Sequence, residues 1–155
     1  MRSLVSLLFV AFACTFAARA DAQELLSKEN ALARLQGHWK AEKWVIHGKD
    51  TSEGRDNRSY RIEDQKMIHV TDGNDVGISR FKIDTTSKPY KLDVTYVGGP
   101  RDGQTLLGIF KLENDRFVNC FSYPGDPRPN AFKSTVSNRY FLSIDRKIAD
   151  EKGEP

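Results

Sequence analysis

Three histidines and Cys120 are the side chains in this sequence best suited to hold a metal or to act as nucleophiles. His38, His47 and His69 each lack a second ligand at the helical or hairpin spacing that a zinc site needs. A Cys–His pair would have to combine Cys120 with His69. Cys120 lies among apolar neighbours in a predicted strand, where burial should raise its pKa and blunt its reactivity. These residues predict no metal site and no cofactor.

Carboxylates and glycines give no stronger case for catalysis. Glu63-Asp64 and the pair Asp72 and Asp75 fall in predicted turns, where solvation of a loop explains them. Gly98-Gly99-Pro100 joins two predicted strands and does not lead into a helix, as a phosphate loop does. Charges of both signs are well mixed, and no run of like charges reaches five, which argues against a nucleic-acid partner. We therefore expect a protein that is not an enzyme.

Ligand binding is the alternative chemistry that the sequence offers. Proline-stiffened connections as long as residues 123–138 are usually functional or act as lids. Arg128 and Phe132 in this connection would form the mouth of a pocket for an amphipathic ligand with an anionic group, or Phe132 would simply pack as a flap. Aromatic side chains from predicted strands would line the pocket or fill the core. The ligand-binding candidates are Phe81, Tyr96, Phe110, Arg128, Phe132 and Tyr140.

Two classes of function fit these candidates. In the first, the protein binds a small apolar or amphipathic molecule in the cell envelope. In the second, its interior is filled, and its surface binds another protein or an envelope polymer. The sequence identifies no particular protein partner.

The first 22 residues are typical of an export signal. Arg2 supplies a positive charge, the 13 residues from Leu4 to Phe16 are nearly all apolar, and Ala20-Asp21-Ala22 offers a cleavage site. This apolar stretch is shorter than the roughly 20 residues that span a bilayer. We expect a signal peptide over residues 1–22, a periplasmic or extracellular protein, and no stable membrane insertion.

Cleavage after Ala22 leaves 133 residues with 22 Lys and Arg against 20 Asp and Glu. Such a chain buries about two-thirds of its unfolded-chain surface in one domain. Only Cys120 remains among the cysteines, so a packed core must stabilise the fold without an intramolecular disulfide. We expect a helical lead over residues 23–34, a barrel domain over 35–148 and a flexible tail over 149–155. The helix begins at Glu24 or, alternatively, after Ser27.

Eight apolar runs separated by turn residues predict an all-β domain. Most of the connections are short enough for hairpins, so successive strands should pair antiparallel in an up-and-down meander. Such a meander can close into a barrel and so remove its edges, although an open sandwich of two sheets fits the same pattern. The predicted strands are Gly37–Ile46, Ser59–Glu63, Met67–Thr71, Val76–Asp84, Lys91–Val97, Gln104–Leu112, Arg116–Ser122 and Arg139–Lys147.

Alternation within each run predicts which side chains point inward. The strand at 116–122 is ambiguous, because Phe117, Asn119 and Phe121 compete with Val118 and Cys120 for the inward face. Gly108 marks a sharp bend or a close approach to its backbone. The predicted inward residues are Tyr60, Ile62, Ile68, Val70, Phe81, Ile83, Leu92, Val94, Tyr96, Leu106, Phe110, Leu112, Tyr140, Leu142 and Ile144.

Gly37-x-Trp39 at the start of the first strand, with the basic residue Arg146 late in the last one, resembles the lipocalin (calycin) arrangement. That resemblance implies that Trp39 plugs the barrel floor and that Arg146 lies across its indole. A cation over an indole contributes about 0.5 to 2 kcal/mol, which supports the pairing. Gly37, Trp39 and Arg146 are therefore the expected structural signature.

A second resemblance covers nearly the whole domain. The motif Leu35-Gln36-Gly37-x-Trp39, then Gly108-Ile109-Phe110-x-Leu112, Pro124-Gly125 and Arg128-Pro129 occur together in order. In this the chain resembles the uncharacterised exported LQGxW domain family abundant in planctomycetes. The resemblance implies a lipocalin-like barrel without an assigned activity.

Overall fold

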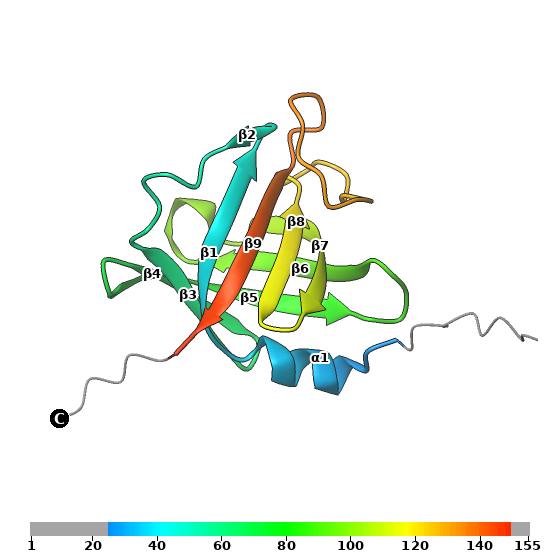
Figure 1. The fold of residues 1–155 in the computed structure, drawn as a ribbon, viewed down its shortest axis with the longest axis horizontal. Coiled ribbons are helices and arrows are strands. Elements are labelled where there is room, and N and C mark those ends of the chain that lie inside the picture. Colours follow the sequence, from blue (N-terminus) through cyan, green and yellow to red (C-terminus); the bar gives the residue numbers. More distant parts are fainter. Residues whose placement is uncertain (1–24, 150–155) are drawn as a thin grey trace, which may run out of the picture.

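The computed structural model describes residues 25–149 (Figure 1). The predicted signal peptide and nearly all of the predicted tail lie outside the described residues. Within 25–149 no helix is long and apolar enough to cross a bilayer.

Consecutive antiparallel strands form one sheet that closes when β1 pairs with β9. The short β2 pairs only with the last residues of β1, so the other eight strands close the barrel. This confirms the predicted barrel and excludes the open sandwich. The elements are α1 (Lys28–Leu35), β1 (Gly37–Ile46), β2 (Lys49–Asp50), β3 (Arg58–Glu63), β4 (Lys66–Thr71), β5 (Asn74–Asp84), β6 (Tyr90–Val97), a 3-10 turn (Gly99–Arg101), β7 (Thr105–Glu113), β8 (Arg116–Phe121) and β9 (Phe141–Ile148).

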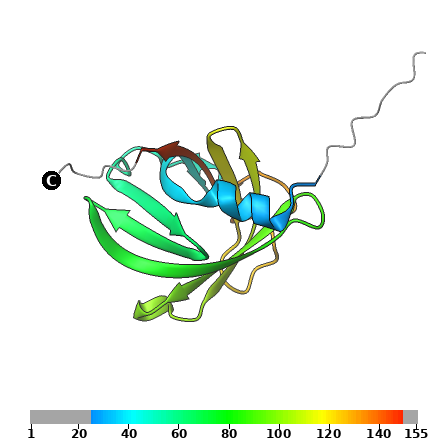
Figure 2. The ribbon, with the colours of Figure 1, turned by 90° about the horizontal axis from the view of Figure 1, so that it is seen from below.

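Helix α1 lies across one end of the barrel, which we call the floor (Figure 2). The Ser27 hydroxyl caps the helix by accepting from the backbone N–H of Asn30 at 3.2 Å, so the helix begins at the later of the two predicted positions. Ala31 and Leu35 are completely buried against the barrel. Gly37 then turns the chain into β1 with a φ of 110°, a value that L side chains rarely adopt.

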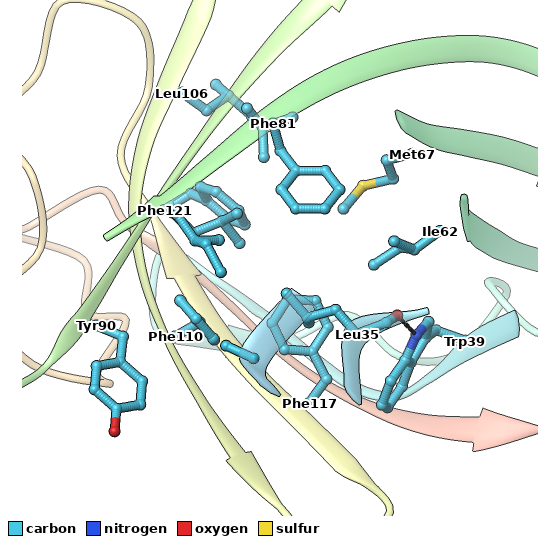
Figure 3. Packing of buried hydrophobic residues seen from close by; sticks show 14 residues of the cluster. Leu35, Trp39, Ile62, Met67, Phe81, Tyr90, Leu106, Phe110, Phe117 and Phe121 are labelled. Atoms are coloured by element: carbon cyan, nitrogen blue, oxygen red, sulfur yellow. Dashed lines mark hydrogen bonds between the residues drawn. The ribbon is translucent and has the colours of Figure 1, made fainter. Parts of the chain in front are cut away.

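Trp39 closes the floor, as predicted. Its side chain is 2% exposed, and its Nε1 donates to the carbonyl of Leu35 at 2.7 Å (Figure 3). Its ring meets Phe117 edge to face at 5.6 Å, and Phe117 meets Phe110 in the same way at 6.0 Å. The lower half of the barrel is therefore a filled aromatic core.

The cation over Trp39 is Lys147, and the prediction that Arg146 lies there is wrong. Lys147 Nζ lies 5.3 Å from the indole centroid, whereas Arg146 is exposed and pairs with Glu42 and Asp115. Lys147 is also the cross-strand partner of Trp39. Directly paired residues point to the same face of a sheet, so the pairing register places Lys147 on the inner face.

The same alternation corrects the whole inner face of β9. The prediction that Tyr140, Leu142 and Ile144 point inward is wrong, because these residues alternate with the ones that do. The inward residues are Phe141, Ser143 and Asp145, which pair with Phe121, Asn119 and Phe117 of β8. This also settles β8, where Phe117, Asn119 and Phe121 face the interior.

The connection between β8 and β9 covers the outer face of β7 and β8, so apolar side chains are buried on that face as well. Cys120 and Ile109 are cross-strand partners there, and both are almost fully buried. The backbone of Lys133, in the connection between β8 and β9, hydrogen-bonds Cys120, and burial raises the pKa of this thiol to about 11. Cys120 is thus a buried apolar group, as predicted.

Strand β4 also points differently from the prediction. Met67 belongs to the core and pairs with Ile62, so Met67 and His69 face inward while Ile68 faces outward. Val70 is buried but lies outside the main core cluster. The pairing of β4 with β5 shifts between His69 and Val70, and this bulge ends the regular alternation.

Candidate ligand site at the open end of the barrel

Asp145 lies inside the barrel, above the aromatic floor, as a fully buried carboxylate. Its Oδ2 accepts hydrogen bonds from Tyr60 Oη at 2.6 Å and from Asn119 Nδ2 at 2.7 Å. Its Oδ1 accepts from Ser143 Oγ at 2.5 Å. Burial raises the pKa of Asp145 to about 6, against the lowering effect of these three donors. The cluster joins β3, β8 and β9 in a polar layer, and Phe121 and Phe141 pack beyond it on β8 and β9.

His69 continues this polar layer on the side of β4. It is the cross-strand partner of Tyr60, and its Nε2 lies 3.0 Å from the hydroxyl of Ser79. Burial lowers the pKa of His69, so the neutral ring is favoured. His69 is therefore an interior side chain, and the two other histidines lie elsewhere in β1 and at its end.

A bulge in β1 brings Trp44 to the inner face. Regular alternation would place Trp39 and Trp44, five residues apart, on opposite faces. The pairing of β1 with β9 shifts between Ala41 and Lys43, so Trp44 pairs with the inward residue Ser143. The guanidinium carbon of Arg55 then lies 4.6 Å from the Trp44 ring centroid. The two tryptophans thus mark the two ends of the barrel.

A cavity of about 330 Å³ opens at this end, next to the Asp145 cluster. Trp44 and Tyr60 give it aromatic walls, and Arg55 and Arg58 give it cationic ones. Among the described residues that line it, none is acidic. Trp44 Nε1 is buried and has no hydrogen-bond partner within residues 25–149. The lining residues are Ala41, Trp44, Arg55, Arg58, Ser59, Tyr60, His69, Val70, Thr71 and Val76.

A second hollow, of about 710 Å³, runs along the outside between α1 and β7. Leu25 and Leu26 of the helix lead form one side, and Phe110 and Phe132 contribute to the other. The hydroxyl of Tyr90 accepts from the backbone N–H of Leu26 at 2.7 Å and so ties the helix lead to β6. This hollow is a groove beside the floor, separate from the open end.

The structure does not gather the six predicted ligand-binding residues into one site. Phe81 and Phe110 lie in the core, and Tyr96 packs partly buried against it. Tyr140 lies in the connection before β9. None of the six lines the cavity at the open end.

Arg128 and Phe132 lie on the outer wall and not at the barrel mouth. Arg128 Nη1 donates to the carbonyl of Gly108 at 2.7 Å and lies 2.5 Å from Asp93 Oδ1. The ring of Phe132 lies 5.3 Å from Lys111 Nζ. The connection therefore matches the flap alternative, clamped against β6 and β7.

The residues of the open end were missed because their signals are not local. Trp44 needs the bulge in β1, and Arg55 lies in a connection without a regular pattern. The alternation of the sequence places Asp145 on the outer face of its strand. Only its hydrogen-bond partners on β3 and β8 show that it lies in the interior.

Comparison of the chain with protein-family models, with curated proteins and with solved structures gives no match. The cavity is therefore interpreted from its own chemistry. Two arginines line it, and in the described part of the chain no cluster of three metal-ligating side chains occurs. This arrangement can hold a ligand that offers acceptors.

Proposed function

We propose that this protein is a non-enzymatic, exported barrel that binds a small apolar or amphipathic ligand in the cell envelope. The ligand lies at the open end, in the cavity between Trp44, Tyr60 and Val70. The volume of about 330 Å³ is at the lower end of the range of small-molecule sites, which combine apolar walls with a few placed polar groups.

The single observation that carries the proposal is the buried Nε1 of Trp44. An unpartnered buried donor costs about 1 to 3 kcal/mol, and Trp39 at the other end satisfies its own donor with the carbonyl of Leu35. A ligand acceptor that reaches Nε1 from the cavity lined by Trp44 would remove this cost. The site is thus suited to a partner that brings an oxygen or nitrogen acceptor.

A rim substitution tests the location of the site. Val76 lines the cavity and is 61% exposed, so Val76→Trp should obstruct it without disturbing the core. Ile78 lies on the same strand, is 45% exposed and does not line the cavity, so Ile78→Trp is the matched control. The probe is 2-naphthoate, measured by calorimetry. We expect at least tenfold weaker binding by the Val76 variant only, and equal binding by both variants would contradict the site.

Export and membership of the LQGxW domain family are part of the same proposal. The apolar segment before residue 22 supports export, and the ordered motifs from Leu35 to Arg128-Pro129 support the family. Mass determination of the protein recovered from the cell envelope would test export. A mass that starts at Gln23 supports it, and a full-length chain confined to the cytoplasm contradicts it.

A second candidate function, binding of an envelope polymer, rests on the outer wall. Ile68, Ile78 and Val97 are successive cross-strand partners on β4, β5 and β6, and Ile78 and Val97 are both more than 40% exposed. Such a row suits a docking surface. Retention on isolated peptidoglycan should fall for Ile78→Lys, and unchanged retention would contradict this function.

A further inference from the structure

We propose that the ligand of the open end is a small monocarboxylate with a flat apolar body, whose carboxylate is held by Arg55 and Arg58. This inference rests on the proposed function and specifies its ligand. It goes beyond that function because a neutral apolar molecule would also satisfy a simple binding barrel.

The charge around the cavity is one-sided. Arg55 and Arg58 both line it, and neither has an ion-pair partner within residues 25–149. Arg61, on the same β3 strand, pairs instead with Asp75 at 2.9 Å. Two arginines without a carboxylate partner, together at one cavity, suit an anionic ligand.

The nearest interior acid does not cancel this charge. Asp145 lies beside the lining residues Ala41 and Tyr60, but it accepts hydrogen bonds from Tyr60, Asn119 and Ser143. Tyr60 Oη donates to Asp145, so this hydroxyl is already committed to the interior carboxylate. The ligand anion is therefore assigned to the arginine side of the cavity, away from β9.

Arg55 is held in place before any ligand arrives. Its Nε donates to the carbonyl of Thr51 at 3.0 Å, and its guanidinium packs on the Trp44 ring. These contacts leave its two terminal nitrogens for a carboxylate, which a guanidinium binds in a two-pronged geometry. Preorganisation of this kind reduces the entropy cost of binding. Arg58 begins β3 at the rim, on the same face as Tyr60 and Ile62, and supplies a second charge.

The remaining walls select the body of the ligand. Trp44 and Tyr60 provide aromatic surfaces, and Ala41, Val70 and Val76 provide aliphatic ones. Trp44 also carries a buried Nε1 that has no hydrogen-bond partner among the described residues. A cavity of about 330 Å³ with these walls suits one or two fused rings, or a short branched chain, with one acid group.

The test compares two ligands of nearly identical shape, 2-naphthoate and 2-naphthamide, by calorimetry at low and at moderate salt. We expect the carboxylate to bind the wild-type protein at least tenfold more tightly than the amide, with an affinity that falls as salt is added. Equal affinity for the two ligands overturns the carboxylate assignment and leaves the proposed function standing. Binding of neither ligand contradicts the proposed function itself.

Variants then locate the charge. Arg55→Gln and Arg58→Gln should each reduce the preference for 2-naphthoate severalfold while leaving the affinity for 2-naphthamide nearly unchanged. Arg55→Lys should restore part of the preference, because it keeps the charge but loses the two-pronged geometry. Arg80→Gln is the matched control, since Arg80 is exposed on β5 and does not line this cavity.

A preference that survives both cavity substitutions, or that Arg80→Gln reduces equally, overturns the assignment. If Arg55→Gln unfolds the protein, Arg58→Gln and the salt dependence of the wild-type protein decide the question. Loss of affinity for both ligands in a folded Arg55 variant would also overturn it, because that result marks a packing role for Arg55.

Discussion

At the scale of single residues, a few side chains decide how each end of the barrel is closed. Trp39 satisfies its indole N–H within the chain and carries Lys147 over its ring. Trp44 carries Arg55 over its ring but leaves its indole N–H buried and unpaired in the described structure. The first arrangement satisfies its indole donor within the chain, and the second does not. This contrast is the reason to place function at the end that holds Trp44.

Lys147, and not Arg146, should control the surroundings of Trp39. In a Trp44→Phe background, Lys147→Gln should shift the Trp39 emission and cost roughly 0.5 to 1 kcal/mol of the free energy of unfolding. Arg146→Gln should leave the emission unchanged, because Arg146 only joins exposed ion pairs with Glu42 and Asp115. A shift of the Trp39 emission in the Arg146 variant alone would contradict the placement of Lys147 over the indole.

Asp145 should make stability depend on pH. Its folded pKa of about 6 lies above its ordinary value of 3.8, so the folded state binds the proton more tightly than the unfolded state. Its contribution is then complete below about pH 4 and is lost as pH rises through 6, for a total of about 3 kcal/mol. Urea unfolding of wild type and Asp145→Asn at pH 4 to 8 isolates this group.

In that comparison, the free energy of unfolding of the wild type should fall relative to the variant as pH rises. Other carboxylates are common to both chains and cancel in the difference. A difference that is constant would show that the three hydrogen-bond donors balance burial, and one that grows with pH would show that they outweigh it.

At the scale of elements, the number and order of the barrel strands follow from the sequence. Which side chains of a strand point inward does not always follow from it. Turn residues mark the chain reversals, so the boundaries of most strands are predicted within about two residues. Strands β5, β6 and β7 alternate cleanly, and Phe81, Leu92 and Leu106 point inward as predicted. In β9 both faces carry apolar residues. The polar side chain of Asp145 is stable on the inner face because Tyr60 and Asn119 donate hydrogen bonds to it.

The bulge in β1 shows the same limit of local patterns. Nothing within residues 37–46 marks where the alternation shifts, because the extra residue is specified by the pairing with β9. A one-residue change of register exchanges the two faces of a strand. The inward position of Trp44, and with it the candidate site, therefore follows only from the pairing of β1 with β9.

Gly108 in β7 should be required by its neighbour on β8. A Cβ at this position would lie 2.3 Å from Phe121 Cδ1, so Gly108→Ala should destabilise the fold by roughly 1 to 3 kcal/mol. Gly77→Ala is the matched control, because a Cβ there meets nothing within 4 Å. Urea unfolding midpoints measure both effects. Equal midpoints would show that Phe121 does not pack against Gly108.

At the scale of the whole molecule, the barrel divides into a filled floor and an open end. Helix α1, Trp39 and the aromatic residues of β7 and β8 seal the floor. The Asp145 cluster lies above it inside the barrel, and the cavity with its two arginines opens beside Tyr60 of that cluster. The sequence predicted that Trp39 closes the floor. It did not predict the residues that line the cavity at the open end, because four strands, one connection and the bulge in β1 bring them together.

The two indole N–H resonances report on the two ends of the barrel separately, and Trp39 and Trp44 are the only tryptophans in the chain. A nitrogen–proton NMR titration with 2-naphthoate therefore tests the central claim most directly. We expect the Trp44 resonance to move with saturation, because its buried donor gains an acceptor. The Trp39 resonance should stay in place, because its donor is already bound to the carbonyl of Leu35. Movement of Trp39 alone, or saturable binding that moves neither resonance, would contradict a ligand site at the open end.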